Sequence, residues 1–299
     1  MGAELDRLRA LLGSQKPERV TQAAFDFDDQ HLMRLVGLGL HEPASGGDLY
    51  EYTQDLLYVN EIQAELFTYL LPVCLRAWRE HLRGAGIGYV GFVENFYPVL
   101  AHPRVRDVLD PEQCAAISTY MSRTLLEEID EQRGLSYRGM GARPYRWVRA
   151  LTTHGVLFSD IEQVWTDWWS IGSVGRAIAA AQYLSCMMYA NAENPIFAAW
   201  TPDAGGGPPC LWEYAGHLYA HCWLEPNVAF LKRSLVPRQL EQRLERVVET
   251  LEGKPEHEVA AAMLEDVPLC AETLGARCEE LPHLLATVQR VDTLLEWTL

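Results

Sequence analysis

The feature that most constrains this chain is a run of apolar residues at helical spacing after Asn60. The run recurs at steps of three and four residues, at Ile62, Leu66, Tyr69, Leu70, Val73, Ala77 and Trp78. Residues at these steps share one face of an α-helix, so the run predicts an amphipathic helix with a buried face. Asn60 stands at the expected N-cap, with Gln63 at the capping-box position. Pro72 predicts a kink or a junction between two helices within the run.

The same spacing predicts further helices along the chain. They are expected at residues 4–12, at 30–38, after Asp110 and Pro111, after Ser159 and Asp160, in an alanine-rich segment that ends near Tyr189, and at residues 210–224, 236–251, 256–264, 269–278 and 281–297. Residues 49–59 and 87–93 contain β-formers without the clean alternation of a strand. The sequence therefore predicts an all-α fold, a single large or two-lobed helical domain, with room for a minor β-hairpin near the N-terminus.

The strongest loop signal lies at residues 201–209, which read TPDAGGGPP. Runs of glycine and proline interrupt helices and favour linkers. A phosphate-binding loop would also need a lysine followed by serine or threonine, and neither follows the glycines here. We therefore expect a helical domain at residues 1–200 and a C-terminal helical subdomain at residues 210–299 that packs on it.

The charge of the chain is strongly acidic. Asp and Glu number 41 against 25 Lys and Arg, which gives a formal net charge of −16. Such a surplus keeps a protein soluble and attracts positively charged partners. Nucleic-acid binding needs a basic surface, so we do not expect it. Most of the basic residues are arginine, a bias that indicates a GC-rich coding sequence and hence a bacterial source.

No segment of the sequence reads as a targeting or membrane signal. The charged N-terminal segment, residues 1–13, lacks the apolar core of a signal peptide. The least charged stretch, residues 178–200, includes Gln182, Asn191 and Glu193, which a membrane helix would not carry together. The seven cysteines form no CxxC pair, as is typical of reduced thiols. We therefore expect a cytoplasmic protein that does not bind a membrane.

Glu213, His217 and His221 are the sharpest candidates for chemistry, because they follow one another at steps of four residues. A helix would place all three on one face, where two histidines and a carboxylate can hold a divalent metal ion. The zinc-protease motif requires a glutamate directly after the first histidine, and Leu218 stands there instead. Packing within an aromatic helix is the alternative interpretation, and we predict no cofactor.

A second acidic cluster, Asp26, Asp28 and Asp29, lies in the segment FDFDD. Three carboxylates so close together can bind Mg²⁺ or Ca²⁺, although no calcium-loop pattern surrounds them. An exposed turn anchored by its two phenylalanines is the alternative. The chain contains no GxSxG motif and no recognised cysteine signature, so the sequence gives no support for catalysis.

One stretch, residues 49–83, resembles a known pattern. An aromatic lead, LYEYTQDLLYV, is followed by an acidic helix start, NEIQAELF, and then by YLLPVCLRAW. This order is similar to that of small bacterial proteins encoded beside polymorphic or contact-dependent toxins. The resemblance implies a toxin-immunity protein, which binds a toxin domain, covers its active site and uses no cofactor.

Three functions compete on these grounds. An immunity protein would use its acidic surface to bind a cognate, basic toxin. An adaptor or chaperone for a secreted effector would expose a large apolar groove. A helical metal-dependent hydrolase would use Glu213, His217 and His221, or the FDFDD aspartates. We rank immunity first, and its candidate partner-binding residues are Asp26, Asp28, Asp29, Glu127, Glu128, Asp130 and Glu131.

Overall fold

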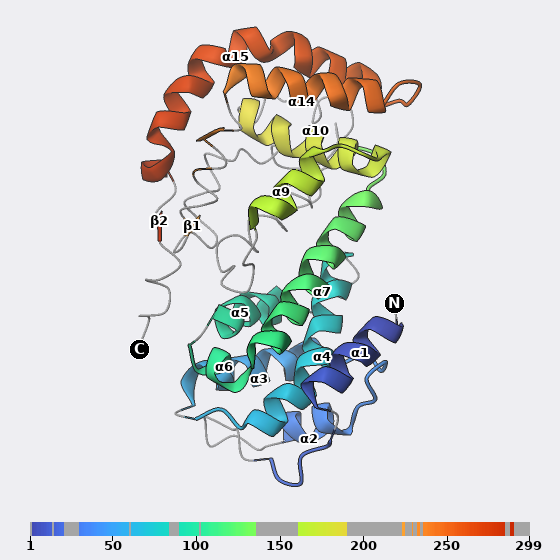
Figure 1. The fold of residues 1–299 in the computed structure, drawn as a ribbon, viewed down its shortest axis with the longest axis vertical. Coiled ribbons are helices and arrows are strands. Elements are labelled where there is room, and N and C mark those ends of the chain that lie inside the picture. Colours follow the sequence, from blue (N-terminus) through green and yellow to red (C-terminus); the bar gives the residue numbers. More distant parts are fainter. Residues whose placement is uncertain are drawn as a thin grey trace. The chain divides into compact units, whose positions relative to one another are not determined.

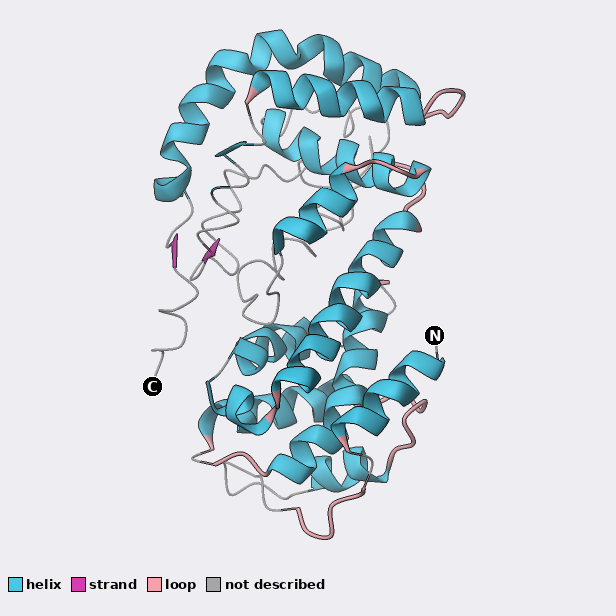
Figure 2. Cartoon of the chain, in the orientation of Figure 1, coloured by secondary structure: helices cyan, strands magenta, loops and turns pink. Residues whose placement is uncertain are grey.

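The computed structural model describes residues 2–13, 15–20, 30–59, 61–83, 90–101, 103–135, 161–189, 223–224, 229, 232–233, 236–284 and 288–289. Within these ranges 78% of the residues are helical, in 11 helices, which confirms the all-α prediction (Figures 1 and 2). The helices are α1 (Gly2–Leu12), α2 (Gln30–Gly37), α3 (Gly46–Tyr58), α4 (Ala64–Leu82), α5 (Val90–Ala101), α6 (Pro103–Val108), α7 (Pro111–Asp130), α9 (Ile161–Trp169), α10 (Val174–Met188), α14 (Pro237–Thr250) and α15 (His257–Leu284).

The chain divides into two compact units, and the division falls within α7, between Thr124 and Leu125. The first unit contains α1 to α6 and the larger part of α7. The second contains the end of α7 with α9, α10, α14 and α15. The predicted boundary at residues 201–209 lies outside the described residues, so the division into residues 1–200 and 210–299 stays a prediction.

Helix α4 forms the centre of the first unit, and α1 and α2 pack on it. Its residues from Tyr69 to Arg79 are all buried, which confirms the helix expected from the apolar run. The helix begins at Ala64 with Gln63 as N-cap, so the expected cap at Asn60 is wrong. It also continues through Pro72 without a junction. Burial on every side stabilises the helix enough to offset the hydrogen bond that proline removes.

The expected β-hairpin is wrong for the residues that the structure describes. Residues 49–58 lie in α3, and residues 90–93 begin α5. The hydroxyl of Ser45 caps α3 by accepting a hydrogen bond from the backbone N–H of Asp48, at 3.4 Å. The buried positions of α3 that carry tyrosine, threonine or leucine follow helical spacing: Leu49, Tyr52, Thr53 and Leu56. Packing of this face against α2 and α5 overrides the strand preference of tyrosine and threonine.

Helices α10 and α14 confirm the two predictions made for the second unit from an alanine-rich and an amphipathic pattern. From Ala177 to Ser185 every residue of α10 is buried, and α9, α14 and α15 pack around this helix. The buried side of α14 is formed by Leu240, Leu244 and Val247. Side-chain burial at helical spacing thus forms the core of this unit.

The C-terminal part of the chain differs from the prediction of three short helices. Residues 257–284 form one helix, α15, which continues through Pro268 and Gly275. Its buried side is continuous across both breakers: Val259, Ala260, Met263, Val267 and Leu274. Strands β1 (Trp223–Leu224) and β2 (Val288–Gln289) pair in parallel, where helices had been expected. Tertiary packing of the apolar side therefore outweighs the local helix-breaking signals.

Candidate functional site

Helix α7, which carries the predicted acidic residues near its C-terminal end, begins with a capping box. Asp110 and Gln113 form a reciprocal capping box, in which the Asp110 carboxylate accepts from the Gln113 N–H at 2.8 Å. The Gln113 side chain accepts from the Asp110 N–H at 3.0 Å. Asp110 is therefore the N-cap of α7, at the start of the helix that the sequence predicted after Asp110 and Pro111.

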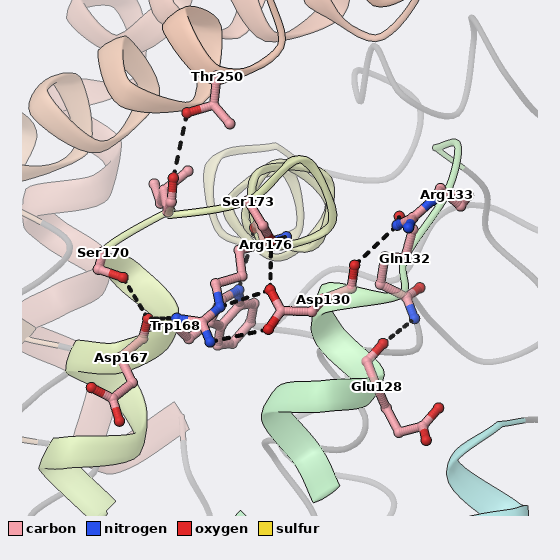
Figure 3. Close-up of polar contacts among 11 residues, drawn as sticks. Glu128, Asp130, Gln132, Arg133, Asp167, Trp168, Ser170, Ser173, Arg176 and Thr250 are labelled. Atoms are coloured by element: carbon pink, nitrogen blue, oxygen red, sulfur yellow. Dashed lines mark hydrogen bonds and ion pairs between the residues drawn. The ribbon is translucent and has the colours of Figure 1, made fainter. Parts of the chain in front are cut away.

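Asp130 is the centre of a polar network rather than a solvated charge (Figure 3). One carboxylate oxygen accepts from the Ser173 hydroxyl at 2.5 Å and from Arg176 Nε at 2.9 Å. The other oxygen accepts from Arg176 Nη2 at 3.1 Å. Arg176 also donates to the backbone carbonyl of Asp167 at 2.5 Å. The carboxylate therefore links the end of α7 to α10, and the guanidinium links both to α9.

A glycine permits this close approach of α7 and α10. A Cβ on Gly175 would lie 2.0 Å from the backbone oxygen of Asp130 and 2.8 Å from that of Ile129. Both obstacles are backbone atoms, which cannot rotate away. The absence of a side chain at Gly175 is thus required for the Asp130–Arg176 pair to form.

The connection between α9 and α10 also forms a hydrogen bond with α14. Ile171 adopts φ +51°, a left-handed conformation that is rare for a β-branched residue. Its carbonyl accepts a hydrogen bond of 3.4 Å from the hydroxyl of Thr250, at the end of α14. Ser173, two residues on, caps α10 by accepting from the Arg176 N–H at 3.1 Å. The network around Asp130 therefore maintains a turn of unusual backbone geometry.

The other acidic residues predicted on α7 differ in exposure. Glu128 is only 3% exposed, because it falls on the same side of the helix as Thr124 and Leu125. Glu127 is half-buried and Glu131 is exposed. The predicted contact residues of α7 therefore do not share one exposed face, because helical spacing places Glu128 on the buried side.

An aromatic cluster adjoins this network. Trp165, Trp168 and Trp169 of α9 stack with ring centroids 5.0 to 6.0 Å apart, and Tyr183 of α10 meets them edge-on. The guanidinium of Arg243 lies 4.9 Å from the centre of the Trp169 ring, and burial lowers the pKa of Arg243. The cluster is a packed junction of α9, α10 and α14, stabilised by aromatic and cation–π contacts.

The first unit has its own buried polar pair. His31 of α2 and Asp55 of α3 are 4% and 5% exposed, and His31 Nε2 lies 2.9 Å from Asp55 Oδ2. Beside it, Arg34 donates from Nε and Nη2 to the two carboxylate oxygens of Asp48. Both pairs connect α2 to α3, so these polar side chains act within the fold.

The outer side of α15 is a feature that our sequence analysis missed. Every third or fourth residue along it is exposed, and glutamates alternate with alanine or leucine: Glu258, Ala262, Glu265, Leu269, Glu272, Ala276 and Glu279. The spacing is visible in the sequence. It was overlooked because separate short helices were expected at residues 256–264 and 269–278, which divide the repeat.

The remaining candidate residues lie outside the described part of the chain. These are Asp26, Asp28 and Asp29 of the FDFDD segment, and Glu213, His217 and His221 of the metal motif. Among the residues that are described, no group of three or more His, Cys, Asp or Glu side chains is arranged to hold a metal ion. A helix both long and apolar enough to cross a membrane is likewise absent from the described ranges.

Comparison with known proteins adds no relative. No family model and no curated protein matches the sequence, and no solved structure matches the fold.

Proposed function

We propose that this chain is a binding protein that neutralises a basic bacterial toxin by covering the toxin's active site. The observation that carries the proposal is the net charge of −16. A surface of this sign accelerates association with a basic protein, since long-range attraction guides the two together before they touch. The resemblance of residues 49–83 to proteins encoded beside toxins supports the same function.

The burial and the contacts of the α7 carboxylates narrow the set of candidate contact residues. Glu128 is buried and Asp130 is engaged by Ser173 and Arg176, so both serve the fold. Glu131 is exposed and keeps its place as a candidate contact, with half-buried Glu127 beside it. The aspartates of FDFDD remain candidates from the sequence. A toxin's active site, lined to bind an anionic substrate, would meet exposed carboxylates of this kind.

The proposal includes a cytoplasmic location, where an immunity protein meets a toxin that has entered the cell, and no cofactor. The alternatives keep no specific observation in their favour among the described residues. The large exposed apolar side chains are scattered over three helices and a helix cap: Met33, Tyr50, Tyr58, Leu269 and Val236. An adaptor would gather such side chains in one groove.

The test is a pull-down from the native organism with the tagged protein, in about 0.05 M and about 0.3 M salt, where screening differs strongly. We expect one basic protein whose toxicity on expression is abolished by co-expression of this chain, and whose association weakens at the higher salt. Recovery of no such protein, together with a stoichiometric metal ion that His217→Ala, His221→Ala removes, would overturn the proposal in favour of the hydrolase.

A further inference from the structure

The outer side of α15 has a regular seven-residue repeat. Glutamates occupy every seventh position, and small or apolar residues occupy a second position four residues further on. The glutamates are Glu258, Glu265, Glu272 and Glu279, and the second set is Ala262, Leu269 and Ala276. All seven residues are exposed, and we call this set the α15 stripe.

The α15 stripe is not needed to hold the helix in the fold. The opposite side of α15 packs against α14 and α10, through residues such as Met263 and Val267. Helix α15 is also twice as long as α14, and it extends beyond the segment that runs alongside α14 (Figure 1). The stripe is therefore an unpartnered helix face within the second unit.

Leu269 is the most exposed large apolar residue described, with 80% of its surface accessible. Surface leucines are common singly, but this one lies at the centre of the stripe. Alanines stand seven residues away on either side, at positions 262 and 276. Small side chains beside a larger one allow another helix to approach closely and to receive the leucine in a gap between its own side chains.

The charges define which helix would fit. None of the four stripe glutamates forms an ion pair in the described part of the chain. Seven residues of helix span about 10.5 Å, so the glutamates recur at that distance along the face. A helix with lysine or arginine at the same repeat would pair with them throughout. A second copy of α15 would instead bring like charges together, and an anionic membrane would be repelled.

We propose that the α15 stripe binds a basic amphipathic helix of a partner protein. Leu269 is the central anchor, and Glu265 and Glu272, one turn to either side, form the ion pairs that set the register. The inference rests on the proposed function only in taking the partner to be basic. The repeat of seven residues keeps the stripe on one face of α15, so that ion pairs at the glutamates and close approach at the small residues can recur along a partner helix.

The test uses a synthetic helical peptide of about 25 residues, or about seven turns. The peptide carries lysine at every seventh position and leucine four residues after each lysine; a twin peptide has glutamate in place of lysine. Binding of the fluorescent peptides to the full chain is measured by anisotropy. The variants are Glu265→Lys, Glu272→Lys and Leu269→Ser. The matched control is Glu241→Lys, Glu245→Lys, which makes the same change of net charge on exposed positions of α14.

We expect the double reversal on α15 to weaken the lysine peptide about tenfold or more, and Leu269→Ser to weaken it about fivefold. The α14 control should change binding less than about twofold, at a salt concentration where the Debye length is near 10 Å. The reversed α15 variant should bind the glutamate peptide better than the original chain does. This gain of binding requires a folded protein.

Equal weakening by the α14 control, or unchanged binding after Leu269→Ser, would overturn the inference, because either result means non-specific charge attraction. No toxin takes part in this assay. Failure here therefore leaves the neutralisation test standing, and failure of the neutralisation test leaves a peptide site on α15 standing.

Discussion

Substitution of Gly175 by alanine probes the junction of α7 and α10 most directly. An added Cβ would lie 2.0 Å from the Asp130 carbonyl oxygen, whereas ordinary contact begins near 3.4 Å. The difference, 3.4 minus 2.0, is about 1.4 Å, and the start of α10 has to move away from α7 by this amount. The obstacle is backbone within a helix, so the adjustment cannot be local.

The expected loss of stability follows from the contacts that such a movement breaks. Arg176 lies 2.9 and 3.1 Å from the two Asp130 oxygens, so a further 1.4 Å takes both beyond hydrogen-bond range. The two side chains are 20% and 37% exposed, which places this pair between surface and buried pairs, at about 1.5 kcal/mol. Overpacking adds about 1–3 kcal/mol, and the better helix propensity of alanine offsets about 0.5–1 kcal/mol. We expect Gly175→Ala to lower the free energy of unfolding by about 2–3 kcal/mol.

The assay is urea denaturation followed by tryptophan fluorescence, to which the cluster around Trp168 contributes. Gly275→Ala is the matched control, since Gly275 is exposed on α15 and no atom lies within 4 Å of its added Cβ. There the same change should raise stability by up to about 1 kcal/mol. If Gly175→Ala leaves the midpoint within about 0.5 kcal/mol of the original while the control behaves as expected, the packing argument is refuted.

Three further outcomes follow from the described contacts. Asp110→Ala removes the cap on Gln113 and should cost about 1 kcal/mol, measured by thermal denaturation, and no loss would contradict the capping argument. Burial raises the pKa of the Cys74 thiol, so iodoacetamide at neutral pH should modify it only in urea, as followed by peptide mass spectrometry. Burial raises the pKa of Tyr52 and Tyr189 above the ordinary 10.0. The unfolded chain then loses phenol protons that the native chain keeps, so the urea midpoint should fall as pH rises beyond about 10, and less so after Tyr189→Phe.

The predictable part of the fold consists of helices whose own sequence identifies their buried side. Helices α4, α10 and α14 show apolar residues at helical spacing, and burial of those residues decides their structure. The start of α7 at Asp110 could be predicted for the same reason, since the contacts that cap it lie within four residues. Local patterns are sufficient where the stabilising contacts are also local.

Contacts between distant residues could not be foreseen in this way. Asp130 and Arg176 are 46 residues apart, and nothing in the segment EEIDEQR distinguishes Asp130 from its acidic neighbours. Gly175 likewise reads as a helix breaker, whereas the structure uses it for a close approach of backbones. The continuity of α15 through Pro268 has the same origin, because the packing of its buried side on α14 and α10 decides the outcome.

The internal pairs also change what the net charge means for binding. Asp48 is matched by Arg34, and Asp130 by Arg176, so each pair neutralises one charge of either sign. Such pairs leave the surplus of 16 negative charges unaltered. The surplus is therefore carried by other carboxylates. Part of this surplus lies on the α15 stripe, where four exposed glutamates follow one another at regular spacing. A partner helix that binds the stripe would respond to the spacing of the glutamates as well as to the sign of their charge. The α14 control makes the same change of net charge elsewhere, so it separates these two effects.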